Sequence, residues 1–200
     1  MALSKPTERE LMHQREIIIR GYRRADGMFD IEAHLTDTKS YSFPAQERGR
    51  IAAGEPLHEM WVRMTVDEDM LIQSCEAVTD HGPYAICPDA APNFSRLAGL
   101  KIGRGFLKAA AERVGGVAGC THLRELLQQL GTVAFQTLYP VRARREAAGK
   151  SAESAPRLLN SCYAYASSSP VVRRRWPQFY TGPEEAAGEE IVVQMAAGED

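Results

Sequence analysis

The residues best suited to chemistry in this chain are thiols and imidazoles that stand beside expected helix starts and strand ends. Cys120 and His122 lie in the segment Gly119-Cys120-Thr121-His122, which follows a glycine-rich approach and opens a strongly periodic helical pattern. Free backbone amides and polar side chains meet at such a point, which suits an anion or a metal ion bound by thiolate and imidazole. Because a simple helix cap explains two such residues equally well, a metal site needs ligands from elsewhere in the chain.

His58 and Cys87 are the candidates for those ligands. His58 precedes the strand-like segment 60–66, and Cys87 stands at a junction between a strand pattern and a helix pattern. Two antiparallel strands joined by a short turn place the start of the first beside the end of the second. We therefore predict a single metal site whose ligands are His58, Cys87, Cys120 and His122. Asp80 and Cys162 are open candidates for a further ligand.

The donor types limit the chemistry of such a site. Mixed nitrogen and sulfur ligation suits zinc or iron, and an iron–sulfur cluster is a further option. Three protein ligands would leave a position on zinc open for hydrolytic chemistry, whereas four would make a closed structural site. The alternative is a metal-free enzyme with Cys120 as nucleophile and His122 or His58 as base, acting on a small organic or thioester substrate. A binding module without chemistry is the third hypothesis.

Carboxylates on the first expected hairpin offer a different, acid–base hypothesis. Asp30, Glu32 and His34 share the polar face of one alternating strand pattern, and Asp37 follows them. A solvated sheet face explains this alternation without any active site. Cys75 falls inside a strand pattern and is predicted to be a buried thiol.

Strand patterns come first in the chain and helix patterns follow. Segments 16–22 and 29–36 flank a turn at 25–27, and segments 60–66 and 70–78 flank a turn at 67–69. Between the two hairpins we expect a loop at 41–54, with a short strand inside it as an option. Helices are predicted at about 89–98, 105–114 and 121–139, the last ending before Pro140. This segregated order predicts an α+β fold, a two-layer sandwich in which an antiparallel sheet of N-terminal hairpins is covered by C-terminal helices.

The predicted organisation is a flexible N-terminus at 1–12, a single α+β domain at 13–181 and a disordered acidic tail at 182–200. The stretch 141–156 within the domain is linker-like, or a frayed helix. After Thr181 there are six acidic residues and no Lys or Arg, so the tail carries a charge of −6 and the rest of the chain +4. Like charges with glycine and alanine cannot bury enough apolar area to offset the entropy of ordering.

Composition bounds the class of protein. The chain has 200 residues, of which 44% are hydrophobic and 25% charged, as in a soluble globular protein. No apolar run approaches the roughly 20 residues of a membrane-spanning helix, and the N-terminus has no signal-like apolar core. We expect a cytoplasmic protein that binds neither nucleic acid nor membranes. A small-molecule substrate remains an option, and the oligomeric state is left open.

Residues 55–140 resemble, in layout, the U-type iron–sulfur cluster scaffold proteins. The resemblance rests on segment 57–72, on the later Cys87, and on the thiol and imidazole that open a helix. The ligand positions of that family imply His58, Cys87, and Cys120 with His122 in this chain. The pair here is Cys-Thr-His, whereas the two residues are adjacent in the family.

The whole chain more closely resembles an uncharacterised bacterial family, the domain of unknown function 2889. The residues that carry this resemblance are Gly21-Tyr22, Asp26-Gly27, Asp30-Ile31-Glu32, Leu35-Thr36-Asp37-Thr38-Lys39, Gly54-Glu55-Pro56-Leu57-His58-Glu59-Met60-Trp61, Cys87-Pro88, Gly119-Cys120-Thr121-His122-Leu123 and Leu159-Asn160-Ser161-Cys162. This family has no established activity, so the resemblance implies membership and no reaction.

Overall fold

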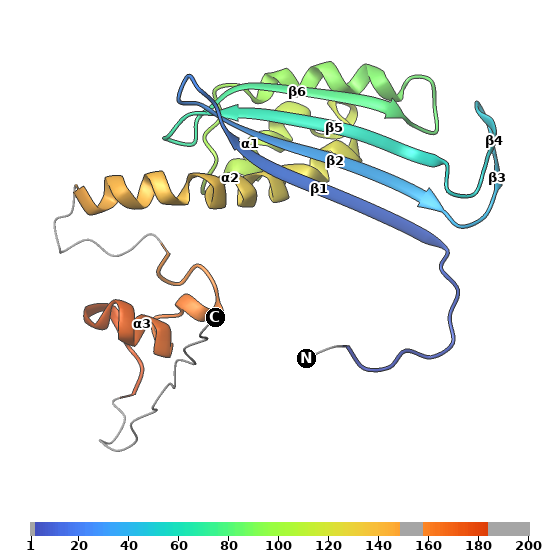
Figure 1. The fold of residues 1–200 in the computed structure, drawn as a ribbon. Coiled ribbons are helices and arrows are strands. Elements are labelled where there is room, and N and C mark those ends of the chain that lie inside the picture. Colours follow the sequence, from blue (N-terminus) through green and yellow to red (C-terminus); the bar gives the residue numbers. More distant parts are fainter. Residues whose placement is uncertain (1–2, 149–157, 184–200) are drawn as a thin grey trace, which may run out of the picture. The chain divides into compact units, whose positions relative to one another are not determined.

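Four strands form one antiparallel sheet in the spatial order β1, β2, β5, β6 (Figure 1). They are β1 (His13–Arg23), β2 (Phe29–Lys39), β5 (Pro56–Val66) and β6 (Ile72–His81). The two predicted hairpins are confirmed, although β6 begins and ends later than expected. β3 (Phe43–Ala45) and β4 (Gly49–Ile51) pair with each other inside the segment predicted as a loop.

The turn between β1 and β2 explains why the two strands pair in full register. Arg24 N donates to Met28 O over 2.9 Å, and Gly27 N donates to Arg24 O over 3.3 Å. Gly27 has φ of 85°, a left-handed conformation that glycine adopts without steric cost. The predicted turn signal at 25–27 is therefore confirmed by the conformation that requires it.

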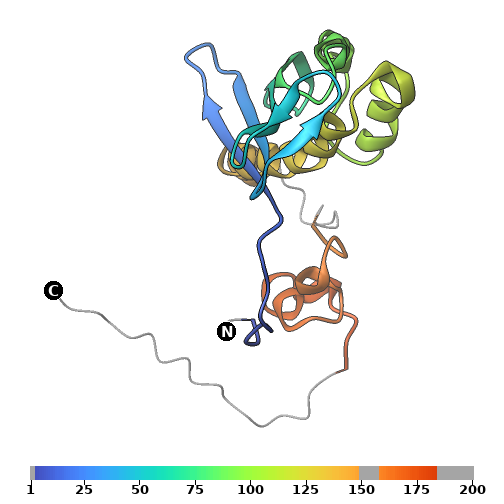
Figure 2. The same ribbon diagram turned by 90° about the vertical axis from the view of Figure 1, so that its right-hand side faces the viewer.

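Three helical segments cover one face of this sheet. They are the 3₁₀ segment η1 (Cys87–Leu97), α1 (Phe106–Val114) and α2 (Thr121–Ala148). Helix α2 packs on β1, β2 and β5, while η1 packs on β6. Figure 2 shows the helices of this unit on one side of the strands. The predicted α+β arrangement of two layers is confirmed.

Two helix predictions need correction, both at prolines. The predicted α-helix at 89–98 is a 3₁₀ segment, since the interior Pro92 lacks the N–H that an α-helical ladder requires. Helix α2 does not end before Pro140 but continues to Ala148. Leu138 is fully buried and Val141 packs against the core, so tertiary contacts on both sides of Pro140 hold the helix together.

The core lies between the sheet and α2. Along β2 the buried Phe29, Ile31, Ala33 and Leu35 alternate with half-buried polar residues, which is the period of a sheet with one covered face. Helix α2 lies close to β1 at Gly21, where an added Cβ would lie 1.8 Å from Thr137 Oγ1. Glycine at this position therefore lets the helix lie against the edge of the sheet.

The computed structural model describes residues 3–148 and 158–183. The chain divides into two units, Met1–Ala148 and Gly149–Asp200, at a boundary that falls within the predicted linker. The described part of the second unit contains α3 (Pro170–Arg175), capped by Ser169, and the short 3₁₀ turns η3 (Tyr163–Tyr165) and η4 (Pro177–Phe179). The predicted acidic tail lies outside the described residues from position 184 onward. Within the described ranges, no helix has the length and apolar character needed to cross a membrane.

Candidate metal centre

The covered face of the sheet changes from apolar to charged at the end where β1 and β5 begin. The alternation that buries Leu35 on β2 also turns Asp37 inward, and Asp37 is almost fully buried. The same alternation on the neighbouring strands turns Arg15 and His58 inward. Arg15 is the register partner of Asp37 on one side, and His58 is its partner on the other. Three adjacent strands thus bring a guanidinium, a carboxylate and an imidazole into one row.

The Asp37 carboxylate accepts hydrogen bonds from four donors. Arg15 donates two hydrogen bonds to it, from Nε to Oδ1 and from Nη2 to Oδ2, each 2.7 Å long. His58 Nδ1 lies 3.0 Å from Oδ2, and His13 Nε2 lies 3.1 Å from Oδ1. An ionised carboxylate has about four lone-pair positions, so this one is saturated by protein donors.

These contacts set the charge of the row. Burial alone would raise the pKa of Asp37, but the hydrogen bonds and positive charge of Arg15, together with His58, outweigh it and lower that pKa below its usual value. The hydrogen bond to Asp37 raises the pKa of Arg15 in turn. Asp37 is therefore a carboxylate that only accepts, so His58 Nδ1 carries the hydrogen and donates it.

The start of α2 brings the second imidazole to this row. The His122 ring stacks on the His58 ring with centroids 3.9 Å apart and planes tilted by 33°. Cys120 Sγ lies 3.8 Å from His122 Nδ1, and Arg15 Nη1 donates to Glu125 Oε2 over 2.6 Å, which ties the helix to β1. Each of Asp37, His58 and His122 offers a ligand atom within 4.8 Å of the other two.

His58 is held in its neutral form. Burial lowers the pKa of His58, and the positive charge of His122 lowers it further, although the contact with Asp37 opposes both effects. With Nδ1 committed to Asp37, the lone pair that remains is on Nε2. A neutral imidazole oriented by a carboxylate on its other nitrogen is the usual form of a metal-bound histidine.

The structure brings two of the four predicted ligands, His58 and His122, into one cluster with Asp37. Cys120 lies beside this cluster, in contact with His122. Cys87 lies instead against the turn after β6, where a Cβ added to Gly82 would be 2.7 Å from the Cys87 Cβ. It is not part of the cluster that the described residues form.

The two open candidates for a further ligand are found elsewhere. Asp80 accepts a hydrogen bond of 2.8 Å from Trp61 Nε1. Cys162 is an exposed thiol of the second unit.

Sequence reasoning missed Asp37 and Arg15 as parts of this site. Asp37 was considered only as an acid–base carboxylate, and Arg15 was not considered at all. The sequence signal for both residues is the two-residue alternation of each strand. A charged residue that continues the inward-facing apolar series of a strand must itself face the core. Such a residue needs a buried partner, and each strand supplies one to its neighbour.

Asp30 and Glu32, the other carboxylates of the alternative acid–base hypothesis, lie on the opposite, open face and are engaged there. Asp30 accepts from Thr65 Oγ1 over 2.7 Å, and Glu32 accepts from Arg63 Nε over 2.6 Å. His34 Nε2 lies 3.1 Å from Glu59 Oε1. These contacts link neighbouring strands, as expected for a polar sheet face.

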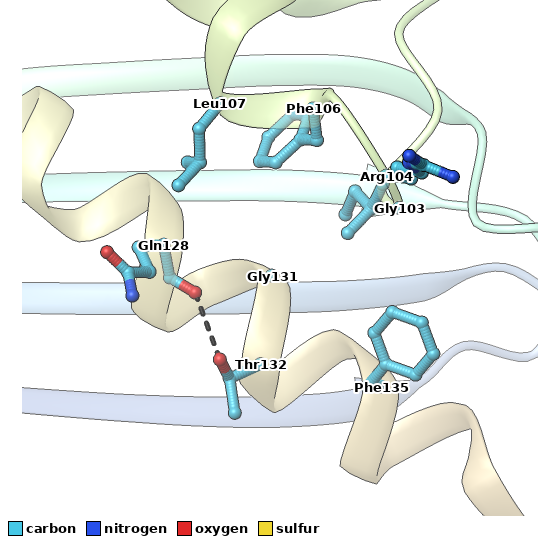
Figure 3. A pocket seen from close by; sticks show the side chains of 9 residues that line it. Gly103, Arg104, Phe106, Leu107, Gln128, Gly131, Thr132 and Phe135 are labelled. Atoms are coloured by element: carbon cyan, nitrogen blue, oxygen red, sulfur yellow. Dashed lines mark hydrogen bonds between the residues drawn. The ribbon is translucent and has the colours of Figure 1, made fainter. Parts of the chain in front are cut away.

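A separate hollow of about 300 Å³ lies between α1 and α2 (Figure 3). Phe106 and Leu107 line it from α1, and Gln128, Thr132 and Phe135 line it from α2. Thr132 Oγ1 is already bonded to Gln128 O, at 3.1 Å. The hollow is mainly apolar. None of Asp37, His58 and His122, the three residues of the Asp37 cluster, lines it.

The fold and the site together define an α+β domain that carries a candidate metal centre between its sheet and its longest helix. The chain belongs to a family of proteins of unknown function, DUF2889, whose model matches residues 13–136. The matched range begins at the first residue of β1 and includes every residue of the Asp37 cluster. No curated protein and no solved structure matches the chain, and the resemblance of residues 55–140 to U-type iron–sulfur scaffolds is not confirmed.

Proposed function

We propose that this chain is a metal-binding protein that holds a divalent zinc or iron ion with His58, His122 and Cys120. The observation that carries the proposal is the convergence of two imidazoles. Ligand atoms of His58 and His122 lie within 4.8 Å of each other, beside the buried Asp37. Two imidazoles with a thiolate or a carboxylate form a donor set that both metals accept.

In this proposal Asp37 positions a ligand and does not bind the ion. Its oxygens already accept four hydrogen bonds, two of them from Arg15 at 2.7 Å, and a metal would have to displace one of these donors. The unused nitrogen of His58 needs no such exchange. A carboxylate behind a metal-binding histidine fixes the tautomer and raises the basicity of the ring.

The distance between Cys120 and His122 fits two ligands of one tetrahedral ion. Bonds of about 2.1 Å to nitrogen and 2.3 Å to sulfur place two such ligands about 3.6 Å apart. The Cys120 Sγ to His122 Nδ1 separation of 3.8 Å is close to this value. Three protein ligands leave one coordination position for a small molecule, and His122 and Cys120 are both only partly buried, so solvent reaches this side.

Metal analysis of the full chain, purified without a metal-chelating tag, tests the proposal. We expect stoichiometric zinc or iron in the wild-type protein, and loss of most of it in His58→Ala and in His122→Ala. The matched control is His81→Ala, because His81 contacts Glu59 at 2.9 Å in an imidazole–carboxylate pair outside the cluster. A wild-type protein that binds neither added zinc nor added ferrous iron contradicts the proposal, as does equal metal loss in the control.

A second candidate function is a metal-free enzyme that uses Cys120 as nucleophile and His122 as base. The 3.8 Å contact between Sγ and Nδ1 supports it, since a neighbouring imidazole can take the thiol proton. Alkylation separates the two candidates. A metal-bound thiolate reacts slowly until a chelator removes the ion, and this is the behaviour we expect. Rapid alkylation of Cys120 in untreated protein, with unchanged metal content in Cys120→Ser, favours the enzyme.

A further inference from the structure

Strand β1 forms one edge of the four-stranded sheet (Figure 1). It has 11 residues and pairs with β2 along its whole length without a register shift. The described residues pair no strand with its other side. Natural edge strands are commonly short, bulged, or interrupted by proline or lysine, because an open edge is a template for another strand. β1 is long and regular and has no proline or lysine; its one protective feature of this kind is the charge of Arg15 on the covered face.

The register shows which backbone groups face the open edge. Arg24 N donates to Met28 O across the hairpin. In an antiparallel ladder the hydrogen-bonded pairs alternate, so the even-numbered residues of β1 bond to β2. The odd-numbered residues then point their N–H and C=O groups outward; they are His13, Arg15, Ile17, Ile19, Gly21 and Arg23. A partner strand must satisfy this spacing.

We propose that two copies of this chain pair antiparallel along the open edges of their β1 strands, with Ile18 of one copy opposite Ile18 of the other. Ile17 of each copy then stands opposite Ile19 of the other, and both are outward-bonding residues, so each such pair exchanges two hydrogen bonds. The two sheets become one continuous sheet.

Charge complementarity selects this register. With Ile18 at the two-fold axis, Glu16 of each copy stands opposite Arg20 of the other, and this contact occurs twice. Glu16 and Arg20 are exposed, and their side chains lie on the open face with Ile18, which is 42% exposed. Opposite charges that face each other across strands stabilise the pair, and like charges destabilise it.

The neighbouring registers are less favourable. Only the odd-numbered residues have outward N–H and C=O groups, so an odd-numbered residue must stand opposite another odd-numbered residue. The partner strand can therefore shift only by two residues at a time. One such shift places Arg15 opposite Arg23, and the shift in the other direction places Glu16 opposite Ile18. Both lose the contacts between Glu16 and Arg20, so the strand sequence fits a second copy of itself best in one register.

Charge reversal tests the pairing on the full chain. We expect a dimer by sedimentation for the wild-type protein, and a dissociation constant raised at least about tenfold in Glu16→Arg and in Arg20→Glu, because each change places like charges opposite each other twice. An equimolar mixture of the two variants should form a heterodimer, since every contact in it is again between opposite charges. Neither residue belongs to the metal cluster.

A monomeric wild-type chain overturns the proposal, and so does a dimer whose mass neither variant changes. The new glutamate of Arg20→Glu would face Glu32 of the same chain and could destabilise the fold. If this variant does not unfold cooperatively, the test rests on Glu16→Arg, whose new side chain faces the uncharged Thr36. Amide hydrogen exchange gives a second measurement. The amides of Ile17 and Ile19 should be protected only at concentrations where the dimer forms, and that of Ile18 at all concentrations. Equal protection of all three at every concentration contradicts the pairing.

Discussion

Asp37 is the residue on which the candidate site depends, because a buried carboxylate is tolerated only when its oxygens are paired. Its four donors come from two other strands, and two of the bonds come from one guanidinium fork. Planar, bidentate bonding of this kind orients both partners, which a lysine ammonium cannot do. The geometry of His58, and with it the metal proposal, therefore rests on Arg15.

Replacing Arg15 with methionine should destabilise the fold by about 2–3 kcal/mol, measured as the free energy of unfolding in urea. The removal of one partner of a fully buried pair costs about 3–5 kcal/mol, and the cost here is lower since the Arg15 side chain is 30% exposed. Arg50→Met is the matched control, because Arg50 is exposed on β4. Equal changes in the two variants would show that Asp37 does not need Arg15.

His58 should make the metal-free protein less stable in mild acid. Because its pKa in the folded protein lies below the usual 6.5, the unfolded chain binds the proton more readily. The contribution of His58 is therefore complete above about pH 6.5 and is lost as the pH falls toward the pKa in the folded state. The free energy of unfolding should fall more steeply with acid in wild-type protein than in His58→Gln. Parallel curves for the two proteins would contradict this expectation.

At the scale of elements, the sequence predicted the local patterns and missed the pairings between distant residues. The segments around Ile17 and Ile31 were found as strands because alternation and β-branched residues are local signals. His58 and His122 were placed together because a strand start and a helix start met at the same end of the predicted sheet. The pair of Asp37 and Arg15 is separated by 22 residues and depends on the register of the first hairpin, which no local pattern reveals.

Replacement by valine should change the stability of the fold in opposite directions at two threonines, Thr79 on the covered face of the sheet and Thr65 on the open face. Thr79 Oγ1 is buried without a hydrogen-bond partner among the described residues, whereas Thr65 Oγ1 donates to Asp30 over 2.7 Å. An unpaired buried hydroxyl costs about 1–3 kcal/mol, so Thr79→Val should raise the melting temperature. Thr65→Val should lower it, because Asp30 then loses a donor. Destabilisation by Thr79→Val would mean that the hydroxyl has a partner in solution.

At the scale of the whole molecule, the main apolar cluster among the described residues belongs to the first unit. Every residue of the main buried cluster, and every partly buried residue packed against it, precedes position 142. A chain that ends at Ala148 should therefore unfold cooperatively and keep the metal content of the full chain. Calorimetry and metal analysis of the two proteins test this. Loss of the transition in the shorter chain would show that the second unit is needed for folding.

The Asp37 cluster lies where β1 begins, so the geometry of the site depends on how often this end of β1 separates from β2. An edge strand opens most readily from its ends, and opening at this end must break the two bonds from Arg15 to Asp37 and admit water to the carboxylate. The same fluctuation removes the Arg15 donors from Asp37, the carboxylate that orients His58. The opening of β1 and the loss of support behind His58 then occur in the same event. An ion bound at His58 would therefore slow hydrogen exchange of the β1 amides, including those of residues that do not contact the ion.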